Sequence, residues 1–217
     1  MKIVITGASC GIGYSCAMLF LQKGHEVHGI DKLPATIQHP AYRHYIADVR
    51  ATMPAIEQVQ VLITAAGIQQ PEEEVLDVNL MGTVRAIERY ALQPAIRSVV
   101  TIASASATNG AEFPLYAASK GGVVSYTKNL ALRLAPYGAV ANSLSPGGVL
   151  TASNAPVLDD PVLKQAVMDE SLLGKWASAD EIAEWAYFLA VINRSMTGQD
   201  LVIDNGEMLK SNFIWPQ

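Results

Sequence analysis

The chain has 217 residues, of which half are apolar, and a formal net charge of -5 at pH 7. This length fits one domain with a large core of its own, and no apolar run approaches the ~18 residues of a membrane-spanning helix. The acidic balance argues against nucleic acid as a partner, and two cysteines, Cys10 and Cys16, without partners at metal spacing indicate neither a disulfide framework nor a metal site.

Strand and helix patterns alternate along the chain. The predicted strands are 2–6, 26–31, 59–65, 98–103, 139–144 and 200–204, and the predicted helices are 13–23, 73–91, 116–134 and 180–191. The strands are short, mostly rich in Val, Ile and Leu, and apolar on both sides, which is typical of strands buried on both faces. The alternation predicts an α/β fold, a doubly wound parallel sheet of the Rossmann type, in a single domain over 1–217.

Two further segments complete the outline. The N-terminus enters the first strand directly, so we expect no secretory signal and a cytoplasmic location. Residues 151–175 are less regular and contain two prolines. We interpret a stretch of about 148–175 as a substrate loop over the edge of the sheet. In such a sheet, ligands bind outside the carboxyl ends of the strands.

A glycine-rich turn, Thr6 to Gly13, follows the first strand and opens the first helix. Glycines let backbone N–H groups approach a pyrophosphate, and the N-terminus of a helix favours negative charge. The alternative is a glycine-rich turn without a ligand. The candidate cofactor contacts in this turn are Gly7, Ser9, Cys10, Gly11, Ile12 and Gly13.

Asp31 ends the second predicted strand. A carboxylate at this place can accept hydrogen bonds from the adenosine ribose hydroxyls and would repel a 2′-phosphate. Lys32 follows directly and could soften that discrimination, and a solvated carboxylate without a ligand is the alternative. We expect NAD as the cofactor, with NADP possible.

Tyr116 and Lys120 lie four residues apart on a predicted helix and therefore project from one face. A phenol titrates near pH ~10 in water, which makes it a poor proton-transfer group at neutral pH. A nearby ammonium favours the phenolate and would turn Tyr116 into a usable acid/base. By itself this spacing is also common on solvated helix surfaces.

The glycine turn and the Tyr116–Lys120 pair together resemble the short-chain dehydrogenase/reductase family, in its single-domain branch. Further segments match motifs of that family in order along the chain: Ala65-Ala66-Gly67, Asp77-Val78-Asn79-Leu80, Ile102-Ala103-Ser104, Asn142 to Thr151, Thr197-Gly198-Gln199 and Asp204-Asn205-Gly206. Thr64 stands where the family has an asparagine whose side chain braces the sheet. We expect the Thr64 hydroxyl to take over part of that role.

The resemblance implies hydride transfer between a secondary alcohol or ketone and a nicotinamide, with Tyr116 exchanging the proton at the oxygen. Lys120 would hold the nicotinamide ribose and favour the phenolate, and Ser104 would hydrogen-bond the substrate oxygen. Asn79 would hold a water that links Lys120 to solvent. Two alternatives stay open: Ser106 is close enough to compete with Ser104, and Asn79 could be a buried helix asparagine bonded to neighbouring backbone.

The resemblance also implies cofactor contacts beyond the glycine turn. Asp48 would bond the amino group of the adenine, and Val49 would flank the ring. The remaining expected contacts are Ala65, Ala66, Gly67, Tyr116, Lys120, Pro146, Gly147, Val149 and Thr151. We expect no metal.

Three regions depart from the family or leave specificity open. Between Asp48 and Gly67 only Met53 to Gln58 could supply the usual third helix. Thr151 to Lys175 would roof the substrate pocket, and Glu112, Phe113 and Pro114 would line one side of it. This lining has few fixed charges and favours a weakly polar substrate. The terminal segment 213–216 could pack on a neighbouring subunit or on its own sheet.

The sequence therefore predicts an NAD-dependent oxidoreductase that interconverts a secondary alcohol and a ketone. The expected partner is a small-molecule alcohol or ketone, without nucleic acid or membrane, in a homodimer or homotetramer. A 3-oxoacyl-thioester reductase of the same family and a catalytically silent dinucleotide-binding regulator are the alternatives.

Overall fold

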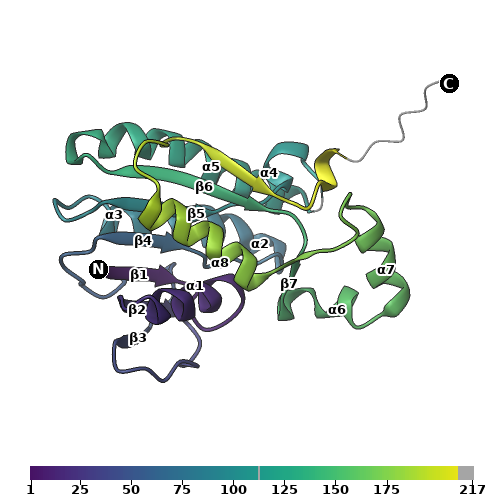
Figure 1. Ribbon diagram of the computed structural model, residues 1–217, viewed down its shortest axis with the longest axis horizontal. Coiled ribbons are helices and arrows are strands. Elements are labelled where there is room, and N and C mark those ends of the chain that lie inside the picture. Colours follow the sequence, from purple (N-terminus) through teal and green to yellow (C-terminus); the bar gives the residue numbers. More distant parts are fainter. Residues whose placement is uncertain (112, 210–217) are drawn as a thin grey trace.

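The expected parallel sheet is present in the computed structural model, which describes residues 1–111 and 113–209. Within these residues the sheet has seven strands in the order β3-β2-β1-β4-β5-β6-β9, all paired in parallel (Figure 1). Their bounds are Lys2–Thr6 (β1), Glu26–Asp31 (β2), Tyr42–Ile46 (β3), Val61–Thr64 (β4), Ser98–Ile102 (β5), Val140–Pro146 (β6) and Asp200–Ile203 (β9). The predicted fold class is confirmed.

Within the seven-stranded sheet, β3 is the strand that the hydrophobic pattern did not predict. It lies at the edge of the sheet and pairs only with β2. Its sequence, Tyr-Arg-His-Tyr-Ile, is mostly polar and its residues are half-buried or exposed. An edge strand needs no apolar surface on both sides, so the rule that finds the inner strands fails for it.

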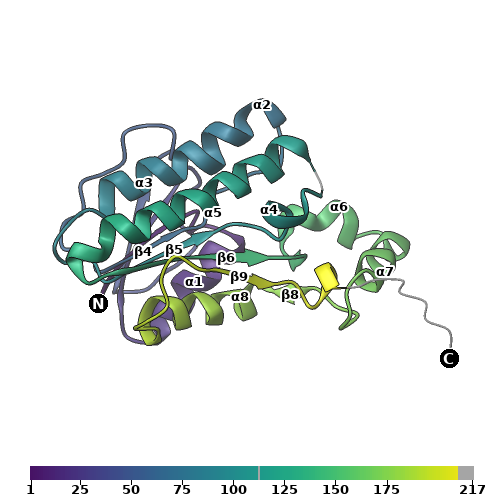
Figure 2. The ribbon, with the colours of Figure 1, turned by 90° about the horizontal axis from the view of Figure 1, so that it is seen from above.

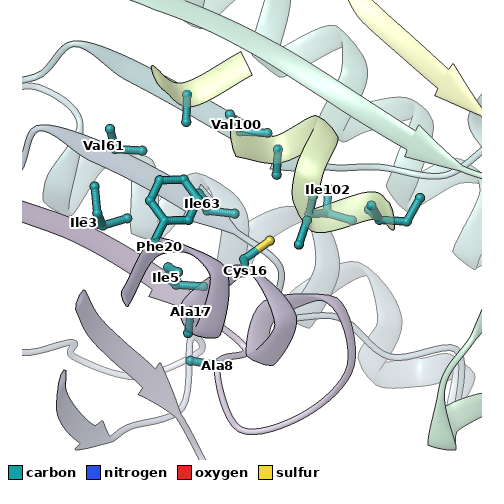
Figure 3. Close-up of a cluster of buried hydrophobic side chains, with 14 of the residues drawn as sticks. Ile3, Ile5, Ala8, Cys16, Ala17, Phe20, Val61, Ile63, Val100 and Ile102 are labelled. Carbon is teal, nitrogen blue, oxygen red and sulfur yellow. The ribbon is translucent and has the colours of Figure 1, made fainter. Parts of the chain in front are cut away.

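Helices cover both faces of the sheet (Figure 2). The helices α1 (Gly11–Gln22) and α8 (Ala179–Tyr187) pack together on one face. The cluster beneath them includes the side chains of Cys16, Phe20 and Ile63 (Figure 3). The other face carries α2 (Glu72–Val75), α3 (Gly82–Tyr90) and α5 (Pro114–Leu134). Its separate cluster includes Leu62, Ile87 and Leu130.

The predicted helix over 73–91 is not regular throughout. Between α2 and α3, the residues Leu76–Met81 form a π-helical turn that contains Asn79. A second π-helical turn, Phe188–Ile192, extends α8. Such turns leave no clear mark in hydrophobic periodicity, and they occur often at functional sites. The sequence left room for the usual third helix only at Met53 to Gln58, and no helix is formed there.

The excursion after β6 carries several short elements. They are β7 (Val149–Leu150), a 3₁₀ turn (Ala152–Asn154), α6 (Ala155–Leu158), α7 (Pro161–Asp169) and β8 (Ala177–Ser178). Outside this excursion, the short helix α4 (Ser106–Asn109) follows β5. The strands β7 and β8 pair in parallel and close the base of the excursion. In the ribbon views α6 and α7 lie beyond the carboxyl end of β6 (Figures 1 and 2). The segment expected to be a substrate loop is thus a pair of helices whose two ends are joined by a separate two-stranded sheet.

In the part of the chain that the structure describes, no helix is both long and apolar enough to cross a membrane.

Candidate functional site

The glycine turn after β1 is packed so tightly that two of its glycines cannot be replaced. Gly7 has a φ of 73°, and a Cβ atom on it would lie 2.7 Å from the backbone nitrogen of Ala66. A Cβ atom on Gly13 would collide with the carbonyl of Gly7. Because β1 pairs with both β2 and β4, this turn lies where the strand order reverses, which is the ligand-binding position of such sheets.

The first turn of α1 is available to an anion. Its N-cap, Cys10, has extended backbone and its side chain caps no N–H group. The first N–H groups of a helix lack partners within the helix and attract phosphate. Thr151, which follows β6 and β7 along the chain, lies close to the turn: a Cβ atom on Gly11 would be 3.7 Å from the Cγ2 atom of Thr151. The structure therefore brings together Gly11 and Thr151, two predicted cofactor residues far apart in sequence.

Asp31 closes one side of the glycine turn. Its Oδ2 atom accepts from the backbone N–H of Ser9 at 3.0 Å, and its Oδ1 atom accepts from that of Leu33 at 2.9 Å. The Ser9 hydroxyl donates to the carbonyl of Pro34 at 3.0 Å, which holds the following loop against the turn. Each carboxylate oxygen retains acceptor capacity for ribose hydroxyls. The geometry fits the adenosine end of a dinucleotide.

Asp48 is bound by an arginine that the sequence did not single out. Arg50 donates to Asp48 with Nη2 to Oδ2 at 2.8 Å, and to Glu74 with Nη1 to Oε2 at 2.8 Å. These hydrogen bonds to Arg50 hold the pKa of Asp48 below its usual range, and Lys32 adds to this. The two-residue spacing of Asp48 and Arg50 was visible in the sequence, whereas the approach of Glu74 depends on the fold.

The end of β4 meets the predicted catalytic residues. A Cβ atom on Gly67 would lie 3.3 Å from Oδ1 of Asn79 and 3.5 Å from Nζ of Lys120. The brace expected from Thr64 is absent, because its buried hydroxyl has no hydrogen-bond partner among the residues described. A threonine side chain is too short to take over the contacts of an asparagine amide here.

Lys120 and Tyr116 lie together, as their spacing predicted. The Lys120 side chain is buried, and its Nζ atom donates to the carbonyl of Ile102 at 2.9 Å. The same atom lies 5.6 Å from the centroid of the Tyr116 ring. Because Ile102 ends β5 two residues before Ser104, these side chains converge at the carboxyl end of that strand.

Ser104 and Ser106 are hydrogen-bonded to each other. Ser104 accepts at its Oγ atom from the hydroxyl of Ser106 at 3.0 Å and from the N–H of Ser106 at 3.3 Å. Both serines are buried, at 7% and 2% exposure. In this arrangement Ser106 supports Ser104, whose own hydroxyl hydrogen is directed to no acceptor among the described residues.

The Asn79 side chain is bonded to neighbouring backbone. Its Oδ1 atom accepts from the N–H of Ile68 at 2.8 Å, and its Nδ2 atom donates to the Ile68 carbonyl at 2.9 Å and to the Ser119 hydroxyl at 3.1 Å. Ser119 in turn donates to the carbonyl of Tyr116 at 2.7 Å. Asn79 therefore ties the loop after β4 to the helix of Tyr116, and its expected role in holding a water that links Lys120 to solvent stays a prediction.

The turn after β6 is held by contacts that the sequence did not reveal. The Pro146 carbonyl accepts from the N–H of Ala105 at 2.8 Å. A Cβ atom on Gly148 would collide with the Trp176 ring, and the Gly148 N–H donates to Oε2 of Glu207 at 3.4 Å. The glycine pair Gly147-Gly148 is visible in the sequence, but its packing partners come from distant segments. The expected wall residue Glu112 and the segment 213–216 lie outside the described residues.

A metal centre is not formed by the described residues, among which no group of three or more His, Cys, Asp or Glu side chains could hold a metal ion.

A parallel sheet of this order, with a tight glycine turn and a strand-end carboxylate at the reversal point, defines a dinucleotide-binding fold. The family model described as enoyl-(acyl carrier protein) reductase matches residues 46–207. Glucose 1-dehydrogenase of Gluconobacter oxydans is 29% identical, over 98% of this chain and 93% of that enzyme. D-threitol dehydrogenase of Mycolicibacterium smegmatis is 30% identical, over 95% and 92% respectively.

The structure of Thermoplasma acidophilum aldohexose dehydrogenase superposes with a TM-score of 0.87 at 25% identity, covering 100% of this chain and 97% of that one. The chain belongs to the short-chain dehydrogenase/reductase family. It is an oxidoreductase of a family that binds a nicotinamide dinucleotide and acts on CH–OH groups of small molecules.

Proposed function

We propose that this protein is an NAD-dependent oxidoreductase that interconverts a secondary alcohol and a ketone, with Tyr116 as the acid/base. The position of Lys120 carries the proposal: its buried ammonium lies 5.6 Å from the centroid of the Tyr116 ring and is held by the carbonyl of Ile102. An ammonium fixed beside a phenol favours the phenolate, which is the form that accepts a proton from an alcohol.

The remaining residues have distinct roles in this proposal. The bound nicotinamide supplies the hydride acceptor for oxidation and the hydride donor for reduction. During oxidation Tyr116 takes the proton of the substrate hydroxyl, and during reduction it returns a proton to the same oxygen. Ser104 donates its hydroxyl hydrogen to that oxygen, oriented by the hydroxyl of Ser106. Asn79 holds the loop of Gly67 against Lys120.

The preference for NAD rests on Asp31 and Arg50. The Asp31 carboxylate is fixed by two backbone N–H groups, so it cannot turn away from an incoming 2′-phosphate. The guanidinium of Arg50 is already paired with the carboxylates of Asp48 and Glu74. Because these two carboxylates largely compensate its charge, Arg50 is a poor partner for the 2′-phosphate of NADP.

The proposal is tested with wild-type protein, NAD and NADP, and a panel of secondary alcohols and ketones. The panel includes sugars and polyols, because two relatives are a glucose and a threitol dehydrogenase. We expect NADH to form from at least one alcohol, and to form faster than NADPH. Binding of NADH without turnover of any substrate would support the silent regulator instead.

A 3-oxoacyl-thioester reductase is the second candidate, because a 3-oxoacyl-[acyl-carrier-protein] reductase of Chlamydia pneumoniae is 26% identical over 94% of this chain. It is tested in the same assay with acetoacetyl-CoA and NADPH or NADH. Reduction of this thioester at a rate well above that of every simple ketone would favour the second candidate. We expect the simple ketones to react faster.

We further propose a homodimer or homotetramer. Trp185, Ile192 and Val202 leave apolar side chains exposed along α8 and β9, at 42%, 57% and 37% exposure. A second copy would cover this surface. Light scattering after size-exclusion chromatography measures the mass directly, and a monomer across the working concentration range would contradict the proposal.

A further inference from the structure

A carboxylate lies directly against the turn after β6. Glu207 begins the 3₁₀ turn Glu207–Leu209 that follows β9. Its Oε2 atom accepts from the Gly148 N–H at 3.4 Å and would be 2.8 Å from a Cβ atom on Gly147. Only the absence of a side chain at Gly147 allows the carboxylate to approach this closely.

This carboxylate lies at the same end of the sheet as the proposed catalytic groups. The carbonyl of Pro146 accepts from the N–H of Ala105, the residue after Ser104. The strand end that carries Ser104 is thus bonded to the turn that Glu207 contacts. In the ribbon views the segment after β9 lies at the same end of the sheet as α4 and α7 (Figures 1 and 2). Glu207 therefore contacts the turn that follows Pro146, at the end of the sheet where Ser104 and the substrate excursion also lie.

The polar groups of Glu207 are poorly satisfied. The carboxylate is half-buried, and the described residues give it one long hydrogen bond, although a carboxylate can accept about four. Burial raises its pKa, and the nearby Asp204 and Glu170 carboxylates raise it further. A half-buried acceptor with unused capacity can accept hydrogen bonds from the hydroxyl groups of a ligand.

Asp204, in contrast, is fully used within its own turn. Its two oxygens accept from the N–H groups of Gly206 and Met208, each at 2.9 Å. The two carboxylates thus differ: Asp204 stabilises its own turn, and Glu207 is directed to Gly147 and Gly148.

We propose that Glu207 determines specificity by accepting hydrogen bonds from the hydroxyl groups of a neutral polyhydroxylated substrate, and that it disfavours anionic substrates by charge repulsion. This inference rests on the proposed function, because it places the substrate beside Ser104. It assigns Glu207 to substrate recognition and not to proton transfer, which belongs to Tyr116.

The test compares wild type with Glu207→Gln, which keeps the shape and removes the charge. The probes are xylitol as neutral polyol, cyclohexanol as an alcohol without further hydroxyls, and gluconate as an anion. We expect KM for xylitol to rise about tenfold with kcat within about threefold, because a charged hydrogen bond is lost. KM for cyclohexanol should stay within about twofold, and that for gluconate should fall.

Two controls separate recognition from structure. Glu170→Gln removes a neighbouring exposed charge that makes no contact with the turn, and it should leave KM for xylitol within about twofold. NADH affinity and thermal unfolding of Glu207→Gln should match wild type. Xylitol binding to the NADH complex, followed by NADH fluorescence, should weaken by the same factor as KM rises.

The outcomes distinguish the two claims. Turnover of cyclohexanol with an unchanged KM for xylitol in Glu207→Gln would overturn this inference and leave the proposed function standing. An absence of turnover with every probe and with every alcohol and ketone of the panel would overturn the proposed function. In that case the binding measurement still decides the role of Glu207: weaker xylitol binding in the variant supports it, and equal or undetectable binding in both proteins overturns it.

Discussion

The two halves of the sheet's carboxyl edge are held by contacts of different kinds. Around β1 and β2, the groups that would hold the adenosine are fixed by backbone atoms: Gly7 packs against the backbone of Ala66, and Asp31 is held by the N–H groups of Ser9 and Leu33. Around β6, Gly147 and Gly148 are packed by side chains from distant segments, Glu207 and Trp176. The cofactor half is therefore held mainly by backbone contacts, and the substrate half by side-chain packing.

This difference suggests a division of labour. Changes in the cofactor half should alter dinucleotide affinity, and changes at β5 and α5 should alter turnover while the dinucleotide still binds. The variants below test that separation.

The largest effect is expected at Tyr116. Tyr116→Phe removes the proposed proton-transfer group and should lower kcat by about a thousandfold, with NADH affinity close to wild type. Steady-state kinetics and NADH fluorescence titration measure the two quantities. Tyr126→Phe is the matched control, since it removes a hydroxyl on the same helix that bonds the surface residue Glu88. An active Tyr116→Phe enzyme would remove Tyr116 from the mechanism.

The second effect tests the cofactor half. Asp31→Ala should weaken NAD binding by about tenfold, because a carboxylate that accepts ribose hydroxyls is lost, and should improve NADP relative to NAD. Calorimetric titration with both dinucleotides gives the ratio. Glu57→Ala removes an exposed charge near Lys2, at the amino end of the sheet, and should leave the ratio unchanged. The ribose assignment fails if Asp31→Ala binds both cofactors as wild type does.

The third prediction concerns the two thiols. Cys10 is exposed in the glycine turn, whereas Cys16 is buried in the core with its pKa raised by burial to about 12. Iodoacetamide should modify only Cys10. Because partial burial and Asp31 raise the pKa of Cys10, its labelling rate should keep rising at pH values where an ordinary thiol has levelled off.

NADH at ten times its Kd should slow this labelling about tenfold, since the reagent then competes with a bound dinucleotide. Mass spectrometry of the labelled peptide gives the rate. Equal rates with and without NADH would place the dinucleotide elsewhere.

The smallest effect is expected at Thr64, between the two halves. Its hydroxyl is buried without a partner, so Thr64→Val should leave the free energy of unfolding unchanged or raise it by up to about 1 kcal/mol. Thr101→Val is the control, because the Thr101 hydroxyl is bonded to that of Thr127 at 2.7 Å, and it should destabilise by about 1 kcal/mol. Urea unfolding measures both. A clear loss of stability in Thr64→Val would show that the hydroxyl has a partner.

The limits of prediction follow the same division. The glycine turn, Asp31 and the Tyr116–Lys120 pair were predictable, because glycines after a strand, a carboxylate at a strand end and a four-residue helix spacing can each be read from the sequence. The edge strand β3 was missed because its burial is incomplete, and the π-helical turn at Asn79 because it breaks helix periodicity without a sequence mark. Contacts such as Glu207 with Gly148 join residues that only the folded chain brings together.

The central claim is that the two halves meet so that a hydride passes from an alcohol carbon to the nicotinamide. The most direct measurement uses wild-type protein, NAD and a secondary alcohol that carries deuterium on its carbinol carbon. The account predicts that one deuterium appears at C4 of the reduced nicotinamide, as read by mass spectrometry and NMR. Reduced cofactor without deuterium, or no reduced cofactor while NADH binds, would contradict it.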